Sequence, residues 1–198
     1  MRKAAIIVDV QNDFCKGGAL AVPGGEEVVP LANDYILKGN YDLLIATQDW
    51  HPQNHGSFAS NHPGAKPFDM GELGGKPQVL WPDHCIQGSH GARFHPDLIL
   101  HQVTIFRKGM DPTIDSYSGF YDNDRKKSTG LAEFLDKYEI LFVDVFGLAT
   151  DYCVSATALD GIREGYNVNM FLAASRGIAA ESIDKAVKQM RDAGVKVV

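Results

Sequence analysis

The sequence has few cysteines, no excess of positive charge and no long hydrophobic run. Its 198 residues include three cysteines, an odd number that argues against a disulfide framework and suits a reducing cytoplasm. The 25 acidic residues outnumber the 19 Lys and Arg residues, and the net charge is −6. We therefore expect neither nucleic acid nor an anionic membrane as a partner. No apolar segment reaches the roughly 20 residues of a membrane span, and the N-terminal apolar run is too short for a signal peptide.

Several common active-site motifs are also missing. The glycine pairs at 17–18 and 24–25 do not fit a phosphate-binding loop, and the segment that begins at Gly147 is not a dinucleotide-binding fingerprint. The serine nucleophile motif Gly-x-Ser-x-Gly is absent. These absences leave nucleotide binding and serine hydrolase chemistry without support.

Buried strands alternate with helices along the chain. We expect strands at residues 4–10, 42–47, 103–107, 140–145 and 166–172, with residues 195–198 closing the sheet. Helices are expected at residues 26–38, 128–138, 151–164 and 182–193, with Ser128 or Thr129 as an N-cap. This order predicts a single α/β domain over residues 1–198, with a parallel sheet between two layers of helices. Sites in such folds lie at the carboxyl ends of the strands.

One segment breaks the alternation. Residues 48–101 are rich in Gly, Pro, His and Asn and show little periodicity. Loops of this length inside compact domains are usually functional or disordered, and the scattered histidines and aromatic residues favour a functional loop.

Three residues at expected strand ends could carry covalent chemistry. Cys153 lies between the strand at 140–145 and a helical pattern, where a helix N-terminus favours a thiolate and can stabilise an oxyanion. Asp9 could accept the thiol proton, and Lys108 could stabilise the thiolate. Each has a plainer alternative: Cys153 as a small core residue, Asp9 as a cap of backbone amides, and Lys108 as a surface lysine.

A metal site is also predicted. Asp49, His51 and the more distant His84 offer the oxygen and nitrogen ligands of a divalent ion, although Asp-x-His alone is a weak signal. Cys85 is expected to point away from the site. The remaining histidines of the region are expected to be solvated loop residues, namely His55, His62, His90, His95 and His101.

Six segments together resemble the nicotinamidase branch of the isochorismatase-like cysteine hydrolases. In chain order they are AAIIVDVQNDFCKGGAL, TQDWHPQNHGSFAS, WPDHCIQGS, FRKG, DSYSGFYDN and GLATDYCVSATALD. They run from near residue 4 to near residue 177, so the resemblance covers most of the chain. It implies a Rossmann-like three-layer sandwich with about six mainly parallel strands and a long metal-bearing loop insertion.

The resemblance also implies roles for individual residues. It assigns a catalytic triad of Asp9, Lys108 and Cys153, and a divalent metal on Asp49, His51 and His84. A cis peptide is implied at Leu148–Ala149, with the N–H groups of Ala149 and Cys153 holding the oxyanion. Substrate contacts are implied for Phe14, Trp81, Tyr117 and Leu148. Some relatives have one more metal ligand, for which His55 and Ser57 are the candidates here.

The implied reaction is hydrolysis of nicotinamide to nicotinate and ammonia through a cysteine thioester, in NAD salvage, with pyrazinamide as a further substrate. Zinc is the leading metal, with iron and manganese as alternatives. A sibling amidohydrolase, an isochorismatase, a cysteine redox enzyme and a non-catalytic metal-binding domain are the alternative functions. The metal ligand set argues against the first two, and the absence of C-x-x-C argues against a redox enzyme. The oligomeric state stays open, a homo-oligomer included.

Overall fold

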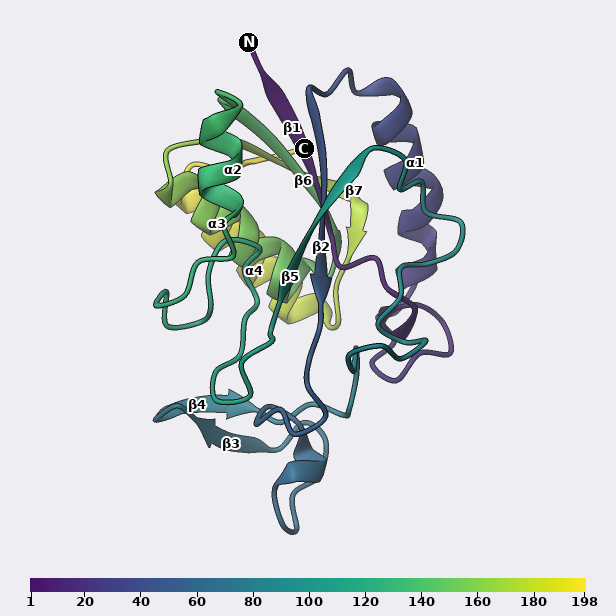
Figure 1. The fold of residues 1–198 in the computed structure, drawn as a ribbon, viewed down its shortest axis with the longest axis vertical. Coiled ribbons are helices and arrows are strands. Elements are labelled where there is room, and N and C mark those ends of the chain that lie inside the picture. Colours follow the sequence, from purple (N-terminus) through teal and green to yellow (C-terminus); the bar gives the residue numbers. More distant parts are fainter.

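The computed structural model describes all 198 residues and contains a six-stranded sheet in which every strand pairing is parallel. The strand order is β5-β2-β1-β6-β7-β8. The strands are β1 (Lys3–Val8), β2 (Leu43–Asp49), β5 (Val103–Lys108), β6 (Phe142–Leu148), β7 (Asn167–Arg176) and β8 (Lys196–Val197). Because parallel strands need crossover connections, helices lie on both faces of the sheet (Figure 1). The expected α/β three-layer fold is confirmed.

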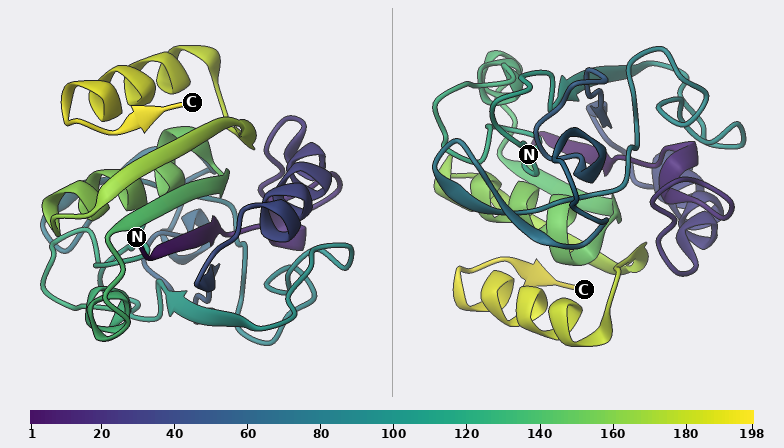
Figure 2. Two further views of the ribbon diagram at one scale, coloured as in Figure 1. Left: turned by 90° about the horizontal axis from the view of Figure 1, so that it is seen from above. Right: turned by 90° about the horizontal axis from the view of Figure 1, so that it is seen from below.

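One helix covers one face of the sheet and three helices cover the other (Figures 1 and 2). The single helix is α1 (Val28–Lys38), and the other three are α2 (Leu131–Lys137), α3 (Ser155–Arg163) and α4 (Ala180–Asp192). The longest of them has 13 residues, and none combines the length and apolar character that crossing a bilayer requires.

The central strand β1 is buried on both of its faces. Successive side chains of a strand point to opposite sides of the sheet. Accordingly, Ala4, Ile6 and Val8 pack in the hydrophobic cluster that includes residues of α2, α3 and α4. Ala5 and Ile7 pack in the smaller cluster that includes residues of α1. A run of apolar and β-branched residues is therefore the sequence signature of this strand.

Two helices begin differently from the sequence expectation. Helix α2 begins at Leu131 with Gly130 as its N-cap, because Gly130 adopts a left-handed φ of 88°. The hydroxyls of Ser128 and Thr129 accept hydrogen bonds from the N–H groups of Gly130 and Leu131, but both residues stay in the preceding loop. The helix expected from residue 151 starts as a π-helical turn, Thr150–Val154, which continues into α3.

Part of the segment 48–101 forms an antiparallel hairpin that the sequence analysis missed. Strand β3 (Met70–Leu73) pairs with β4 (Lys76–Val79) through a two-residue turn. The turn residues Gly74 and Gly75 have φ values of 59° and 79°, which a tight hairpin turn of this hand requires. The hairpin lies beyond the carboxyl end of β2, away from the helices (Figure 1). Its strands of four residues and its proline gave no clear alternating pattern.

A glycine is required at position 147, where β6 lies close to the end of β1 that precedes Asp9. Its φ is +130°, and a Cβ there would lie 2.2 Å from the carbonyl oxygen of Val8. We predict that Gly147→Ala lowers the free energy of unfolding by about 3 kcal/mol or more, because backbone strain and a clash add together. Urea denaturation measures this loss.

Gly165→Ala is the matched control. Gly165 also has a positive φ, +92°, but no other segment comes within 4 Å of the position that a Cβ would take. The control should therefore lose only about 1–2 kcal/mol, the cost of the left-handed backbone. Equal losses in the two variants would contradict the proposed close approach of β6 to β1.

Candidate active site

The carboxyl ends of the parallel strands bring three reactive side chains together. Asp9 directly follows β1, Lys108 ends β5, and Cys153 lies in the π-helical turn that follows β6. All three are buried, with 0%, 2% and 6% of their surfaces exposed. Because parallel strands end at the same edge of the sheet, side chains nearly 150 residues apart in sequence meet there.

The Lys108 ammonium is at the centre of this cluster. Its Nζ donates hydrogen bonds to Asp49 Oδ1 (2.5 Å), to the carbonyl oxygen of Ser116 (2.9 Å) and to Cys153 Sγ (3.3 Å). These bonds use all three of its hydrogens. Burial lowers the pKa of Lys108, but the carboxylates of Asp49 and Asp9 outweigh that effect and raise it well above its usual value. The group is therefore a permanent buried cation.

Asp9 has two oxygens in different settings. Oδ1 accepts a 2.6 Å hydrogen bond from the Thr47 hydroxyl. Oδ2 lies 2.9 Å from Lys108 Nζ in an ion pair. Burial raises the pKa of Asp9, and Lys108 only partly offsets this. Oδ2 is consequently a buried acceptor suited to taking a proton from a neighbour.

The pKa of the Cys153 thiol differs from the sequence expectation. The position at a helix start predicts a thiolate, yet burial raises the pKa of Cys153 well above its usual value, and Asp9 and Asp49 raise it further. The ammonium of Lys108 lowers the pKa but does not compensate. Desolvation outweighs the field of the short π-helical turn and favours the thiol form. The implied cis peptide at Leu148–Ala149 is present.

Asp49, His51 and His84 converge as the sequence predicts. Their ligand atoms all lie within 4.8 Å of one another, and all three side chains are buried. The distances from Asp49 Oδ2 to the Nε2 atoms of His51 and His84 are 3.6 Å and 3.9 Å. The Nδ1 atoms of the two rings hydrogen-bond to the carbonyl oxygens of Gly109 and Pro82, which aims both Nε2 atoms at Asp49.

The buried charges fit a divalent cation. Asp9, Asp49 and Asp115 are buried acidic side chains around this centre, while Lys108 is the buried cation among them. One carboxylate and two imidazoles form the oxygen and nitrogen donor set that zinc and related divalent ions bind. Burial lowers the pKa of His84 to about 4, so its imidazole is in the neutral form that binds metals. The site therefore fits one divalent metal ion held by Asp49, His51 and His84.

His55 is buried, contrary to the expectation of a solvated loop histidine. Its ring centroid lies 4.3 Å from that of His51, and its Nδ1 lies 2.7 Å from Ser57 Oγ. His55 forms a second possible ligand group with His51 and Asp115, and neither His55 nor Ser57 joins the group of Asp49 and His84. The Ser57 N–H donates to His55 Nδ1, which leaves the hydrogen on Nε2. The His55 ring thus packs against the ring of His51.

A mostly apolar pocket opens beside the metal ligands and the thiol. Phe14, Trp81, Tyr117, Ala149 and Cys153 line it, as the sequence predicts. The structure adds Leu20, Val22, Asp115, Tyr152 and Ile178 to its lining. No local pattern marks these additional residues, because they come from separate segments of the chain.

Leu148 does not contact this pocket, which corrects its implied role in substrate binding. The side chain is fully buried in the hydrophobic cluster that also contains Phe14. As the last residue of β6 it points into the core. Its place in the site is therefore limited to the backbone that leads into Ala149.

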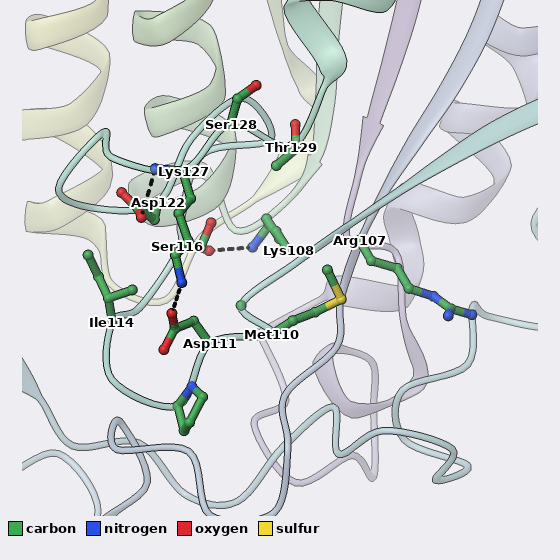
Figure 3. A pocket seen from close by; sticks show the side chains of 12 residues that line it. Arg107, Lys108, Met110, Asp111, Ile114, Ser116, Asp122, Lys127, Ser128 and Thr129 are labelled. Carbon is green, nitrogen blue, oxygen red and sulfur yellow. Dashed lines mark hydrogen bonds and ion pairs between the residues drawn. The ribbon is translucent and has the colours of Figure 1, made fainter.

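A larger, polar hollow of about 500 Å³ lies on the other side of Lys108 (Figure 3). Lys127 forms an ion pair with Asp111 there, and the Arg107 guanidinium points away from the hollow and stacks on Trp50. Its charged groups are thus already paired. This leaves the apolar pocket at Cys153 as the candidate binding site.

The fold and site define an α/β protein with a buried Asp–Lys–Cys cluster beside a divalent metal site. The isochorismatase domain family matches residues 3–198, so this chain belongs to that family. The nicotinamidase of Escherichia coli (strain K12) is 49% identical over 189 residues, covering 93% of this chain and 87% of that protein. The resemblance drawn from the sequence is confirmed.

Similar solved structures support the same family assignment. The nicotinamidase/pyrazinamidase of Acinetobacter baumannii has a TM-score of 0.95 and 45% identity, covering 100% of this chain and 95% of that one. The pyrazinamidase of Pyrococcus horikoshii, in complex with zinc, has a TM-score of 0.83 and 37% identity, covering 100% of this chain and 99% of that one.

We predict that Asp49→Ala abolishes stoichiometric metal binding, because it removes the only carboxylate of the ligand group. Metal analysis of the dialysed protein measures the content. His101→Ala is the control, since His101 is an exposed histidine of the same segment. Unchanged metal stoichiometry in Asp49→Ala would refute the ligand assignment.

Proposed function

We propose that this protein hydrolyses nicotinamide to nicotinate and ammonia through a thioester on Cys153. The observation that carries the proposal is the contact of one buried ammonium, Lys108, with both the thiol and the metal-binding carboxylate Asp49. This contact places a nucleophile and a metal site at the same pocket. The names of the similar proteins support the substrate. The family match over residues 3–198 supports a single catalytic domain.

The pocket suits a flat heteroaromatic ring. Phe14 and Trp81 come from separate segments of the chain and provide aromatic side chains against which a ring can stack. When bound at Asp49, His51 and His84, a divalent ion offers a Lewis-acid partner to a pyridine nitrogen, directly or through a water. Zinc is the leading candidate, since the related Pyrococcus horikoshii structure contains it. A ring held in this way directs its carboxamide toward Cys153.

Acylation begins with proton transfer from the Cys153 thiol to Asp9 Oδ2. The sulfur attacks the carboxamide carbon while Lys108 balances the negative charge of the cluster. The N–H groups of Ala149 and Cys153 hold the oxyanion of the tetrahedral intermediate. Asp9 then gives its proton to the departing nitrogen, so that ammonia leaves and the nicotinoyl thioester remains.

Asp9 transfers a proton again in the deacylation step. Asp9, again ionised, accepts a proton from a water molecule, whose oxygen attacks the thioester carbon. The carbon–sulfur bond breaks, the proton on Asp9 returns to the sulfur, and nicotinic acid leaves and loses its carboxyl proton to solvent as nicotinate. One water is consumed for each nicotinamide, and the cluster regains its starting protonation state.

Pyrazinamide has the same carboxamide on a six-membered ring with nitrogen meta to it, so we propose it as a second substrate. The released nicotinate fits a role in NAD salvage. Three free cysteines suit a reducing compartment, and we therefore propose a cytoplasmic location.

Ammonia release from nicotinamide by the metal-replete protein is the direct test. We expect benzamide, which lacks the ring nitrogen, to be hydrolysed far more slowly, because it cannot meet the metal. A coupled ammonia assay measures both rates. Comparable rates for the two amides would refute the proposed metal–pyridine contact, and no release from nicotinamide would refute the substrate.

Cys153→Ala should reduce turnover by a factor of about 10⁴ or more, because it removes the nucleophile. Its affinity for nicotinate, measured by calorimetry, should stay close to that of the wild-type protein because the ring contacts remain. Substantial turnover by this variant would exclude the thioester route.

Thr47 orients Asp9, and a pair of variants isolates that role. Thr47→Val keeps the shape of the side chain but removes the 2.6 Å hydrogen bond to Asp9 Oδ1. We predict a fall of about 10- to 100-fold in kcat/KM, the usual worth of a hydrogen bond to a charged group. Thr47→Ser keeps the hydroxyl and should retain most of the activity. Similar losses in both variants would show that packing at Thr47 matters and the hydrogen bond does not.

A further inference from the structure

Gln78 is a buried polar residue on an otherwise exposed hairpin. Its side chain is 6% exposed, whereas its neighbours Lys76 and Pro77 on β4 are exposed. The hairpin lies outside the main sheet (Figure 1). A polar side chain that is withdrawn from water in this way needs hydrogen-bond partners, and those partners indicate its role.

The amide of Gln78 is fixed by three acceptors. Its Nε2 lies 2.8 Å from the Val79 carbonyl oxygen, 2.9 Å from Asp115 Oδ2 and 3.1 Å from the Tyr117 hydroxyl oxygen. Reversing the amide would place its oxygen against a carbonyl and a carboxylate, which repel it. The three acceptors share the two amide hydrogens, so the amide has a single orientation with Asp115 and Tyr117 among its acceptors.

Tyr117 in turn restricts the orientation of the Trp81 side chain. The Trp81 Nε1–H donates to the Tyr117 hydroxyl oxygen at 3.3 Å. In both of these hydrogen bonds the Tyr117 oxygen is the acceptor. The hairpin segment also contacts Trp81 on another side, where the exposed Phe68 ring lies edge-on at 6.1 Å between centroids.

We propose that Gln78 is a positioning residue for ring binding. Through its hydrogen bond to Tyr117 it holds Trp81 and Tyr117 as a rigid wall of the pocket, while its hydrogen bond to Asp115 orients the amide. Gln78 is not among the residues that line the pocket, so it acts through these neighbours. This proposal rests on the proposed binding of a pyridine carboxamide in this pocket.

Gln78→Met tests the proposal, because methionine has nearly the same length but no hydrogen-bonding amide. We expect KM for nicotinamide to rise roughly tenfold, as for a lost buried hydrogen bond, with kcat changed less than about twofold. In a Tyr117→Phe background, which already lacks the hydroxyl, the same substitution should raise KM by less than about twofold. Additive effects, or a fall in kcat at unchanged KM, would overturn the proposed route through Tyr117.

Fluorescence supplies a readout that does not depend on turnover. The chain has two tryptophans, so Trp50→Phe leaves Trp81 as the single emitter. In that background Gln78→Met should shift the Trp81 emission and increase its quenching by acrylamide. Unchanged emission and quenching would refute the positioning role even if the wild-type protein did not hydrolyse nicotinamide. The two proposals can therefore fail separately.

Two controls complete the design. Glu72→Gln changes an exposed residue on the facing strand of the same hairpin and should leave KM and emission unchanged. Metal content should be equal in all variants, and a loss of metal in Gln78→Met would show that it acts through Asp115 on the metal site instead. If Gln78→Met does not fold, Gln78→Asn keeps the amide but shortens its reach, and it should show the same rise in KM.

Discussion

The buried ammonium of Lys108 is the interaction on which the rest of this structure depends. A charge inside a protein costs several kcal/mol unless it is paired and hydrogen-bonded. Lys108 is surrounded by Asp9, Asp49, the Ser116 carbonyl and the Cys153 sulfur. These partners come from the ends of β1 and β2, from a loop and from the turn after β6. The ammonium thus holds the nucleophile and the metal-binding carboxylate in one place.

The two carboxylates beside Lys108 are held in opposite ways. Burial alone would raise the pKa of both, but Asp49 also faces His51 and His84, and its pKa is well below its usual value. Asp9 has Thr47 as its other partner, and its pKa is raised. When different surroundings give two neighbouring acids different pKa values, the two acids commonly have different roles in catalysis. In our proposal Asp49 stays ionised as a ligand while Asp9 carries the proton.

Much of the fold could be predicted from local patterns. Apolar β-branched runs identified the six strands of the sheet, although strand and helix ends differed by several residues. The hairpin was missed because its strands are four residues long and include Pro77. The start of α2 was misplaced because Ser128 and Thr129 are typical N-caps, whereas the left-handed Gly130 takes that position. Short elements fixed by turns and tertiary contacts carry little periodic signal.

The sequence by itself determined the strand-end chemistry, because parallel strands must end at one edge and Asp9, Lys108 and Cys153 each follow a strand. Only the tertiary structure decided that the pKa of Cys153 is raised and that His55 is buried, since both depend on the burial that surrounding segments provide. The role proposed for Gln78 was likewise invisible in the sequence. Its partners lie 37 and 39 residues away, and hydrogen bonds across such separations leave no local pattern.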